Sequence, residues 1–359
     1  MSGTGDFKKI QQKIIDNRIP VSINFELTHR CNFNCIHCVR DIRDTEELGT
    51  EKVISILKEL REAGTLELAF TGGEIFLRKD IWEILAAAVD LRFSTTVFTN
   101  GYILDENSVR KLKSLSLRNI DISIYGIKEE THDKVTGVPG SFRKLMEVFR
   151  LMKEHGLPLR LKYMIFDFNA WELPKVYKYA RDNGFLITFD EILFVTDSGS
   201  FCPLNYLASS DKVKFAERFR IKMSGSDSLW TEFEAEPKKD ARIMCTAGRS
   251  TAAIAPNGDL LPCIVWRRPL GSLKTTQFKE LWEKSKNLQK ILDFNDDNFV
   301  KCMKCRLKNH CRVCPGMNEA EMKDPFTPSL QKCRLTEIKM EVLDEYSKEV
   351  PKTRTDKVQ

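Results

Sequence analysis

The stretch VSINFELTHRCNFNCIHC, residues 21–38, decides the fold because it joins a strand to a loop that carries three cysteines. From Val21 to Leu27 every second residue is apolar, which is the period of a strand that buries one face. The cysteines follow at positions 31, 35 and 38. The sequence therefore predicts a group of thiols at the carboxyl end of a strand.

The same strand signal recurs along the chain and alternates with helix signals. We expect strands at residues 21–28, 66–71, 93–99, 118–125, 159–166 and 185–191. We expect helices at residues 50–63, 78–91, 105–114, 141–155 and 171–183, with Thr50 as an N-cap and Gly64 as a stop signal. Repeated strand–helix units predict a parallel sheet, so we expect an α/β fold built as a partial (βα)6 TIM-like barrel.

The predicted strands are polar on one face. Ile120, Ile122 and Ile124 alternate with Asp121 and Ser123, whereas parallel strands covered on both faces are usually apolar throughout. The apolar face would pack under the helices. The polar face would line a lumen that holds water or a ligand, since unpaired buried polar groups are costly. A solvent-exposed antiparallel sheet is the alternative, but the intervening helices disfavour it.

Composition and charge exclude several classes of protein. The 359 residues are 42% hydrophobic and 30% charged, and a dispersed net charge of +6 is too mild to indicate nucleic-acid binding. No apolar run approaches the roughly 18 residues of a membrane span, and residues 1–20 predict a short helix rather than a signal peptide. We therefore expect a cytoplasmic protein with no membrane partner. In that reducing compartment the eleven cysteines indicate metal binding or catalysis.

Cys31, Cys35 and Cys38 form a three-thiolate group on the loop after the first strand. Three thiolates can hold three irons of a cubane cluster and leave the fourth iron open to a small molecule. Zinc is the alternative, but a closed zinc site needs four ligands with pairs spaced more widely, and the adjacent His37 and Cys38 rarely reach one ion. Barrel active sites also gather at the carboxyl ends of strands, where this loop lies.

With Thr71-Gly72-Gly73-Glu74 at the end of the second strand, the CxxxCxxC spacing resembles the radical S-adenosylmethionine (SAM) superfamily. The resemblance implies that Cys31, Cys35 and Cys38 hold the catalytic [4Fe–4S] cluster, whose open iron binds SAM. The residues that it implies as SAM contacts are Gly72, Gly73, Glu74, Thr99, Asn100, Ser123 and Asn169.

Two of the expected contacts carry alternatives. Asn169 and Glu172 also have the spacing of a helix capping box. The family often has an arginine after a His-Asp pair, whereas His132-Asp133 is followed by lysine here. We therefore expect Lys162 to substitute as the partner of the SAM carboxylate.

Seven further cysteines cluster towards the carboxyl end of the chain. Four of them have the spacing Cys302-x2-Cys305-x5-Cys311-x2-Cys314, which is too tight for two zinc knuckles. The turn signal at residues 256–259 predicts a hairpin that brings Cys245 and Cys263 together.

This pattern resembles the SPASM domain, which holds auxiliary iron–sulfur clusters in many radical SAM enzymes. The resemblance implies one cluster on Cys302, Cys305, Cys311 and Cys333, and another on Cys245, Cys263 and Cys314. The last gap of the quartet is two residues rather than the commoner three, and Thr251 stands where some members have an extra cysteine. We therefore expect one or two auxiliary clusters, and the cluster near Cys245 to have only three protein ligands.

These features divide the chain into successive parts. We expect an N-terminal helix at residues 1–20, the partial barrel at 21–192, a connector at 193–240, a small cysteine-rich iron–sulfur domain at 241–338, and a C-terminal helix and tail at 339–359. Cys202 in the connector fits neither motif, and we interpret it as a small buried hydrophobe rather than as a ligand or hydrogen-atom donor.

The resemblance implies a radical SAM enzyme of the SPASM type, which cleaves SAM reductively to a 5′-deoxyadenosyl radical that abstracts hydrogen from a substrate. The first hypothesis is post-translational modification of a peptide, with an external electron donor and a separate peptide-recognition protein as partners, since residues 1–20 are too few for a recognition domain. One alternative is action on a small cofactor precursor such as a tetrapyrrole. A non-catalytic iron–sulfur electron-transfer protein is another, but it gives no role to the open three-cysteine site.

Overall fold

The computed structural model describes residues 3–42, 44–224 and 245–349. Part of the expected connector, residues 225–240, and the end of the expected tail lie outside the described residues. The strands are β1 (Ser22–Thr28), β2 (Glu67–Gly72), β3 (Ser94–Thr99), β4 (Asn119–Ile124), β5 (Leu159–Met164), β6 (Leu186–Asp190), β7 (Thr251–Ile254), β8 (Asp259–Leu261) and β9 (Gly271–Ser272).

Helices follow most of the barrel strands. Those of the barrel are α1 (Gly3–Asp16), α2 (Thr50–Glu62), α3 (Ile81–Asp90), α4 (Glu106–Ser114), α5 (Glu129–Thr136), α6 (Ser141–Glu154), α7 (Leu173–Asp182) and α8 (Ser210–Ser224). Those of the carboxyl-terminal region are α10 (Phe278–Lys284), α11 (Lys286–Leu292), α12 (Val300–Met303), α13 (Pro315–Met322) and α14 (Leu330–Glu349).

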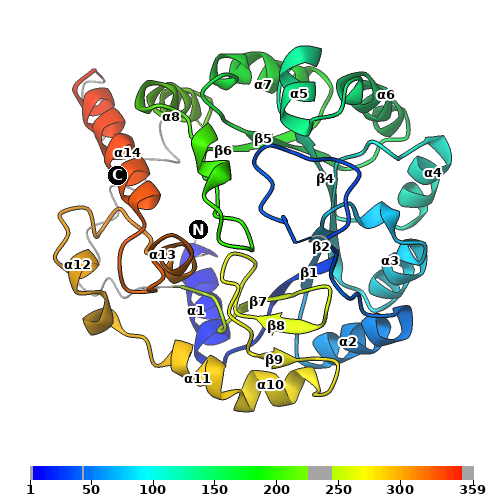
Figure 1. Ribbon diagram of the computed structural model, residues 1–359, viewed down its shortest axis with the longest axis vertical. Helices are drawn as coiled ribbons and strands as arrows, with labels where there is room; N and C mark the ends of the chain where they lie inside the picture. The colour runs from blue at the N-terminus through cyan, green and yellow to red at the C-terminus, as the bar shows by residue number, and fades with distance from the viewer. Residues whose placement is uncertain (1–2, 43, 225–244, 350–359) are drawn as a thin grey trace.

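The nine strands form one sheet in the order β6-β5-β4-β3-β2-β1-β7-β8-β9. Neighbours from β6 to β1 are parallel, so the predicted partial α/β barrel is confirmed, and it is open because β6 and β1 do not pair. Helices α2 to α7 lie outside the sheet, and the loop after β1 lies inside the ring that they form (Figure 1). This arrangement puts the three-cysteine loop at the centre of the barrel mouth.

The sheet continues from the barrel into the cysteine-rich region. β7 pairs in parallel with β1, and the predicted hairpin is confirmed by the antiparallel pair of β7 and β8, with Ala253 opposite Leu261. No sequence pattern indicates the β1–β7 contact, because Thr251–Ile254 is a short, mostly apolar run that can pair with any strand. The shared sheet fixes the auxiliary region against the strand that precedes the three-cysteine loop.

Burial along the strands follows the predicted alternation. In β5 each second residue is fully buried towards the helices, whereas Arg160 and Lys162 are half-buried on the other face. The inner face carries charge pairs: Arg160 donates two hydrogen bonds of 2.9 and 2.7 Å to the fully buried Asp121 of β4. Asp121, the fully buried carboxylate of this face, therefore has an ion-pair partner, as the cost of burying its charge demands.

Two local expectations were wrong. Gly49 rather than Thr50 is the N-cap of α2, and the Thr50 hydroxyl donates to Asp80. Helix α5 was missed because Glu129–Thr136 has a weak apolar periodicity. The expected connector contains helix α8. Gly64 ends α2 as expected, with a positive φ of 95°. No helix among the described residues is long and apolar enough to cross a membrane.

Candidate active site at the barrel mouth

The three-cysteine loop rests on the end of α5. The backbone N–H groups of Asn34 and Ile36 donate to the carbonyls of Thr136 and Val135, at 3.2 and 3.0 Å, and Cys38 N–H donates to Cys35 at 3.0 Å. The helix that sequence analysis missed is therefore the support for this loop. The Sγ atom of Cys38 also lies 3.8 Å from the Arg40 carbonyl.

The Gly72-Gly73 turn is bonded to the residues that precede Cys31. Gly73 N–H donates to Thr28 O at 2.7 Å, and Glu74 N–H donates to Arg30 O at 2.8 Å. A Cβ atom would lie 2.1 Å from the Thr28 oxygen at position 72 and 2.2 Å from the Arg30 oxygen at position 73. Only glycine allows this approach. The sequence suggested that the glycines admit a ligand, but the structure shows a second reason, which is contact with β1.

Glu74 is fully buried, and its carboxylate is occupied by protein donors. It accepts hydrogen bonds from the backbone of Phe76 and Asn100, at 3.1 and 2.8 Å, and from the Thr99 hydroxyl at 2.8 and 2.9 Å. Burial raises the pKa of this carboxyl group, and the hydrogen bonds oppose the rise. Glu74 and Thr99 therefore tie the ends of β2 and β3 together behind the mouth.

Asn100 links the end of β3 to the three-cysteine loop. Its Nδ2 donates to Asn32 Oδ1 at 2.8 Å and lies 3.8 Å from Cys31 Sγ. Ser123 on β4 stands opposite Lys162 on β5, both half-buried on the inner face. The Lys162 Nζ is 5.9 Å from the centre of the Phe98 ring, and burial lowers the pKa of this amine.

Asn169 follows β5, as the sequence indicates, and its side chain binds backbone groups. It is fully buried, and its amide accepts from Phe166 N–H at 2.7 Å and donates to the Tyr125 and Met164 carbonyls at 2.8 and 2.9 Å. These bonds hold the ends of β4 and β5 and use both N–H groups of the amide, which leaves one lone pair of Oδ1 for a ligand. The capping-box interpretation was wrong, because Glu172 accepts from Ile127 and Thr131 instead.

Two buried polar atoms on the three-cysteine loop have no hydrogen-bond partner among the described residues: Asn32 Nδ2 and His37 Nδ1. Tyr125 and Phe166 enclose the His37 ring at 5.1 and 5.2 Å, and burial lowers the pKa of His37 to about 4, so the imidazole is neutral. Unpaired buried polar groups are rare in folded proteins. A bound group with acceptor atoms beside the cysteines would satisfy the Asn32 amide.

The carboxyl-terminal cysteines form two neighbourhoods. Burial raises the pKa of the Cys302 thiol to about 11. The neighbouring thiols of Cys311, Cys333 and Cys305 add to this rise, which shows that they lie close to Cys302. The second neighbourhood joins Cys245 and Cys263 to Cys314: burial and these neighbours raise the pKa of Cys263 to about 12.

They correspond to the two ligand sets that the family resemblance implies, and these sets stay predictions. Packed thiols with raised pKa values become metal ligands only when a metal centre supplies the positive charge that stabilises thiolates, so the donor sets fit iron–sulfur clusters. Across the described ranges, no three His, Cys, Asp or Glu side chains are close enough to share one metal ion, and a cubane cluster is wider than one ion. Cys202 is exposed at the start of a short 3-10 helix, so its interpretation as a buried hydrophobe was wrong.

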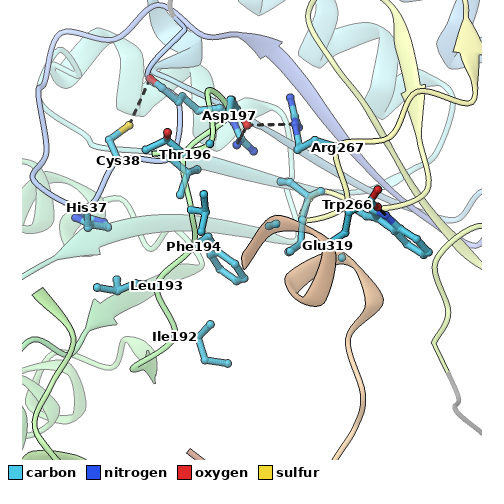
Figure 2. Close-up of a pocket in the computed structure, with 18 of the residues that line it drawn as sticks. His37, Cys38, Ile192, Leu193, Phe194, Thr196, Asp197, Trp266, Arg267 and Glu319 are labelled. Carbon is cyan, nitrogen blue, oxygen red and sulfur yellow. Dashed lines mark hydrogen bonds and ion pairs between the residues drawn. The ribbon is translucent and has the colours of Figure 1, made fainter. Parts of the chain in front are cut away.

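A cavity of about 750 Å³ joins the three-cysteine loop to the auxiliary region. Its walls include Cys38, Gly72 and Trp266, together with the segment 192–197 after β6 and part of α13 (Figure 2). The cavity therefore touches both the expected SAM site and the region of the second cysteine set. No single motif predicts the 192–197 wall, because its residues follow β6 without a pattern.

A ring of four charges closes one side of this cavity. Glu26 of β1 is fully buried and accepts from Arg40 Nε and Arg267 Nη1, both at 2.6 Å. Asp197 Oδ1 accepts from Arg40 Nη1 at 3.0 Å and lies 3.3 Å from Arg267 Nε. Arg40 follows Cys38 by two residues and Arg267 follows Cys263 by four, so the ring joins both cysteine loops. Sequence analysis missed it because the four residues are far apart in the chain.

The fold and the site are those of a partial α/β barrel with a three-cysteine loop at its mouth. Comparison with known proteins shows the family to which the chain belongs. A family model for the radical SAM superfamily matches residues 25–180, and one for an iron–sulfur cluster-binding domain, SPASM, matches residues 245–315. The chain is 30% identical over 290 residues to PqqA peptide cyclase of Granulibacter bethesdensis, covering 76% of each chain. The protein thus belongs to the radical SAM superfamily and carries a SPASM domain.

Two further proteins are similar to the chain. AdoMet-dependent heme synthase of Methanosarcina barkeri is 24% identical over 318 residues, which cover 82% of this chain and 91% of the relative. The crystal structure of Streptococcus suis SuiB bound to precursor peptide SuiA matches with a TM-score of 0.71 at 17% identity, covering 92% of this chain and 80% of SuiB. The SuiB match confirms the fold. Family membership makes the protein an enzyme that uses a [4Fe–4S] cluster, SAM and auxiliary iron–sulfur clusters.

Proposed function

We propose that the protein modifies a peptide by hydrogen abstraction in the cavity between the three-cysteine loop and the auxiliary region. When bound, the cluster and SAM supply a 5′-deoxyadenosyl radical that abstracts hydrogen from the substrate. The observation that carries the proposal is the position of the cavity, whose walls include both Cys38 and Gly72. Any molecule held there lies beside the SAM site.

Cys31, Cys35 and Cys38 are the proposed ligands of the SAM-binding cluster. Support comes from their position on one loop over α5 and from the unpaired Asn32 amide beside them. The backbone of Gly72-Gly73 is the proposed contact of the SAM amino group, since the Glu74 carboxylate is occupied by protein donors. The role of Glu74 is then to hold this backbone in place.

Lys162, Ser123 and Asn100 are the proposed contacts of the rest of SAM. Lys162 is a half-buried cation on the inner face for which no carboxylate lies within ion-pair distance in the described part of the chain. The SAM carboxylate would provide that partner. Its negative charge would offset part of the desolvation cost that lowers the pKa of Lys162. Asn100 would orient the ligand from the cluster side, where it already bonds to Asn32.

The auxiliary ligand sets are proposed from the two cysteine neighbourhoods. Cys302, Cys305, Cys311 and Cys333 form a complete four-thiolate set. Cys245, Cys263 and Cys314 form a set of three, which leaves one corner of a cubane cluster for another ligand. Transfer of electrons to and from these clusters requires an external donor, and a separate peptide-recognition protein would deliver the substrate. All eleven cysteines are free, which supports work in the reducing cytoplasm.

A peptide substrate is preferred over a tetrapyrrole because the chain is 30% identical to PqqA peptide cyclase and 24% identical to the heme synthase. PqqA peptide cyclase acts on a peptide by its name, and the heme synthase relative names the competing substrate class.

The test incubates anaerobically reconstituted enzyme, SAM and reductant with synthetic short peptides encoded beside the gene, and in parallel with coproporphyrin III. A mass change in a peptide together with 5′-deoxyadenosine formation supports the proposal. Conversion of the porphyrin with no change in any peptide contradicts it.

A further inference from the structure

One residue of the cavity wall, Asp197, has a buried carboxylate oxygen that no described protein group satisfies. Asp197 Oδ1 is held by Arg40 and Arg267, but Oδ2 is buried with no hydrogen-bond partner among the described residues. The side chain of Asp197 is only 11% exposed, and the residue lies in the cavity wall between Cys38 and Arg267 (Figure 2). A buried acceptor without a donor is rare in a folded protein. It therefore indicates a donor that arrives with a ligand.

The Asp197 carboxylate cannot turn away to find a donor elsewhere. Its backbone N–H donates to Val39 O at 2.9 Å, and the next residue, Ser198, donates its N–H and hydroxyl to Asp41. Two guanidinium groups hold Oδ1 on the other side. The free oxygen is thus fixed in direction before any substrate binds, and this reduces the entropy lost on binding.

The charges around Asp197 select the kind of donor. Glu26 and Asp197 supply two carboxylates, and Arg40 and Arg267 supply two guanidinium groups, all in hydrogen-bond or ion-pair contact. These four residues therefore carry no net charge, and the other charged residues of the cavity wall are the ion pair of Arg268 with Glu319 and the cation Lys323. A buried ammonium group would gain no net attraction and would lose its hydration, whereas a neutral N–H loses far less. The Oδ2 atom is suited to a neutral amide.

The remaining cavity wall is mostly apolar. Its apolar members include Val39, Met164, Ile192, Phe194, Ile264 and Trp266. An apolar cavity with a few fixed polar groups is typical of sites that bind one ligand in one orientation. The cavity thus fits a molecule with a bulky apolar side chain and a neutral N–H next to it, which is the chemistry of an apolar residue within a peptide.

We propose that Asp197 binds the substrate, with Oδ2 accepting a hydrogen bond from a backbone amide of the apolar residue that occupies the cavity. This inference rests on the proposed function and deepens it, because it names the substrate class and the residue that recognises its backbone. Asp197 then fixes the register of the peptide relative to Gly72, where SAM is expected. The apolar wall takes the side chain beside that amide.

The test uses reconstituted holoenzyme with SAM and no reductant, so that binding is measured without turnover. The probes are capped dipeptides, acetyl-alanyl-X methylamide with X as leucine, methionine, phenylalanine or tryptophan, each with ester twins in which one backbone N–H is replaced by oxygen. Ligand-observed NMR gives the dissociation constants. We expect at least one amide to bind about 10- to 100-fold more tightly than one of its ester twins, as for a hydrogen bond to a charged group.

Two variants separate the hydrogen bond from a general effect on the wall. In Asp197→Asn the two guanidinium groups still donate to the side-chain oxygen, so the NH2 group takes the place of Oδ2. The preference for amide over ester should then fall below about twofold. In Asp41→Asn the bonds to Ser198 are weakened while Oδ2 is unchanged, so the preference should persist. The Asp41 variant is the matched control.

Several results would overturn the proposal: no amide in the series binds, the twins bind equally to the unmodified enzyme, Asp197→Asn keeps the preference, or acetyl-alanyl-lysine methylamide binds best through its ammonium group. Reductive SAM cleavage by the unmodified enzyme is measured alongside. Absence of that cleavage contradicts the proposed function. Cleavage without any preference for amides contradicts only the role of Asp197.

Discussion

Glu26→Gln is expected to destabilise the protein by about 3 kcal/mol. The side chain is fully buried between Arg40 and Arg267, and the pKa of Glu26 is lowered from 4.5 to about 2 despite desolvation, with His29 and the two arginines as the causes. At about 1.36 kcal/mol per pKa unit, this shift corresponds to roughly 3 kcal/mol. Breaking one partner of a buried ion pair costs a similar amount, about 3–5 kcal/mol, because a charge remains buried without compensation.

The assay is urea unfolding of the reconstituted protein at pH 7.5, followed by tryptophan fluorescence under anaerobic conditions. With a denaturant slope of about 3 kcal/mol per molar, the midpoint should fall by roughly 1 M. The matched control is Glu67→Gln on the neighbouring strand, because Glu67 pairs with Arg118 while both side chains are about half exposed. That change should cost less than about 1 kcal/mol. Equal losses for the two variants would refute the reasoning.

The pH dependence gives an independent check on Glu26. Because its pKa is lower in the folded protein than in the unfolded chain, its contribution is complete above about pH 4.5 and is lost as the pH falls towards 2. The difference in stability between the unmodified protein and Glu26→Gln should therefore be constant from pH 7.5 to 5.5. A difference that shrinks across this range would mean that the group titrates there and that the ion pairs are weak.

Three further predictions follow from the site. Gly72→Ala should prevent SAM binding, measured by equilibrium dialysis, because its Cβ would lie 2.1 Å from the Thr28 oxygen. The control variant Gly49→Ala has open space around the new Cβ and should bind SAM as the unmodified protein does. Equal binding by both variants contradicts the close approach. Cys302→Ala and Cys263→Ala should each lose the iron of one auxiliary cluster, and the double variant should lose the iron of both. Iron analysis and Mössbauer spectroscopy measure these losses. Loss of the same iron in both single variants argues against two separate sets of ligands. Cys202→Ala should keep full iron content and SAM cleavage, and a fall in either would make the exposed thiol a ligand.

Much of the barrel could be predicted because its strands alternate at period two and are separated by helices with clear apolar faces. Strand β5 begins at Leu159 as expected, and the hairpin at residues 256–259 is signalled by its turn residues. The three-cysteine loop and the Gly72-Gly73 turn were visible because their residue types and spacing are rare. These are local signals, and local signals can be found in one sequence.

The rest depends on contacts between residues that are far apart in the chain. The ring of Glu26, Arg40, Asp197 and Arg267 spans 241 positions between Glu26 and Arg267, and no spacing rule connects them. The pairing of β7 with β1 has the same origin. Asn169 shows a role that the sequence did not indicate, because its amide satisfies three backbone groups, while its contact with SAM stays a prediction.

The central claim is that Cys31, Cys35 and Cys38 hold an iron–sulfur cluster at which SAM is cleaved. The most direct measurement is 5′-deoxyadenosine formation from SAM and dithionite by the anaerobically reconstituted enzyme, compared with the variant in which all three cysteines are alanine. We expect 5′-deoxyadenosine from the unmodified enzyme and none from the variant, while the iron of the auxiliary clusters is retained. Equal formation by both proteins, or a zinc ion bound by these three cysteines in the active preparation, would contradict it.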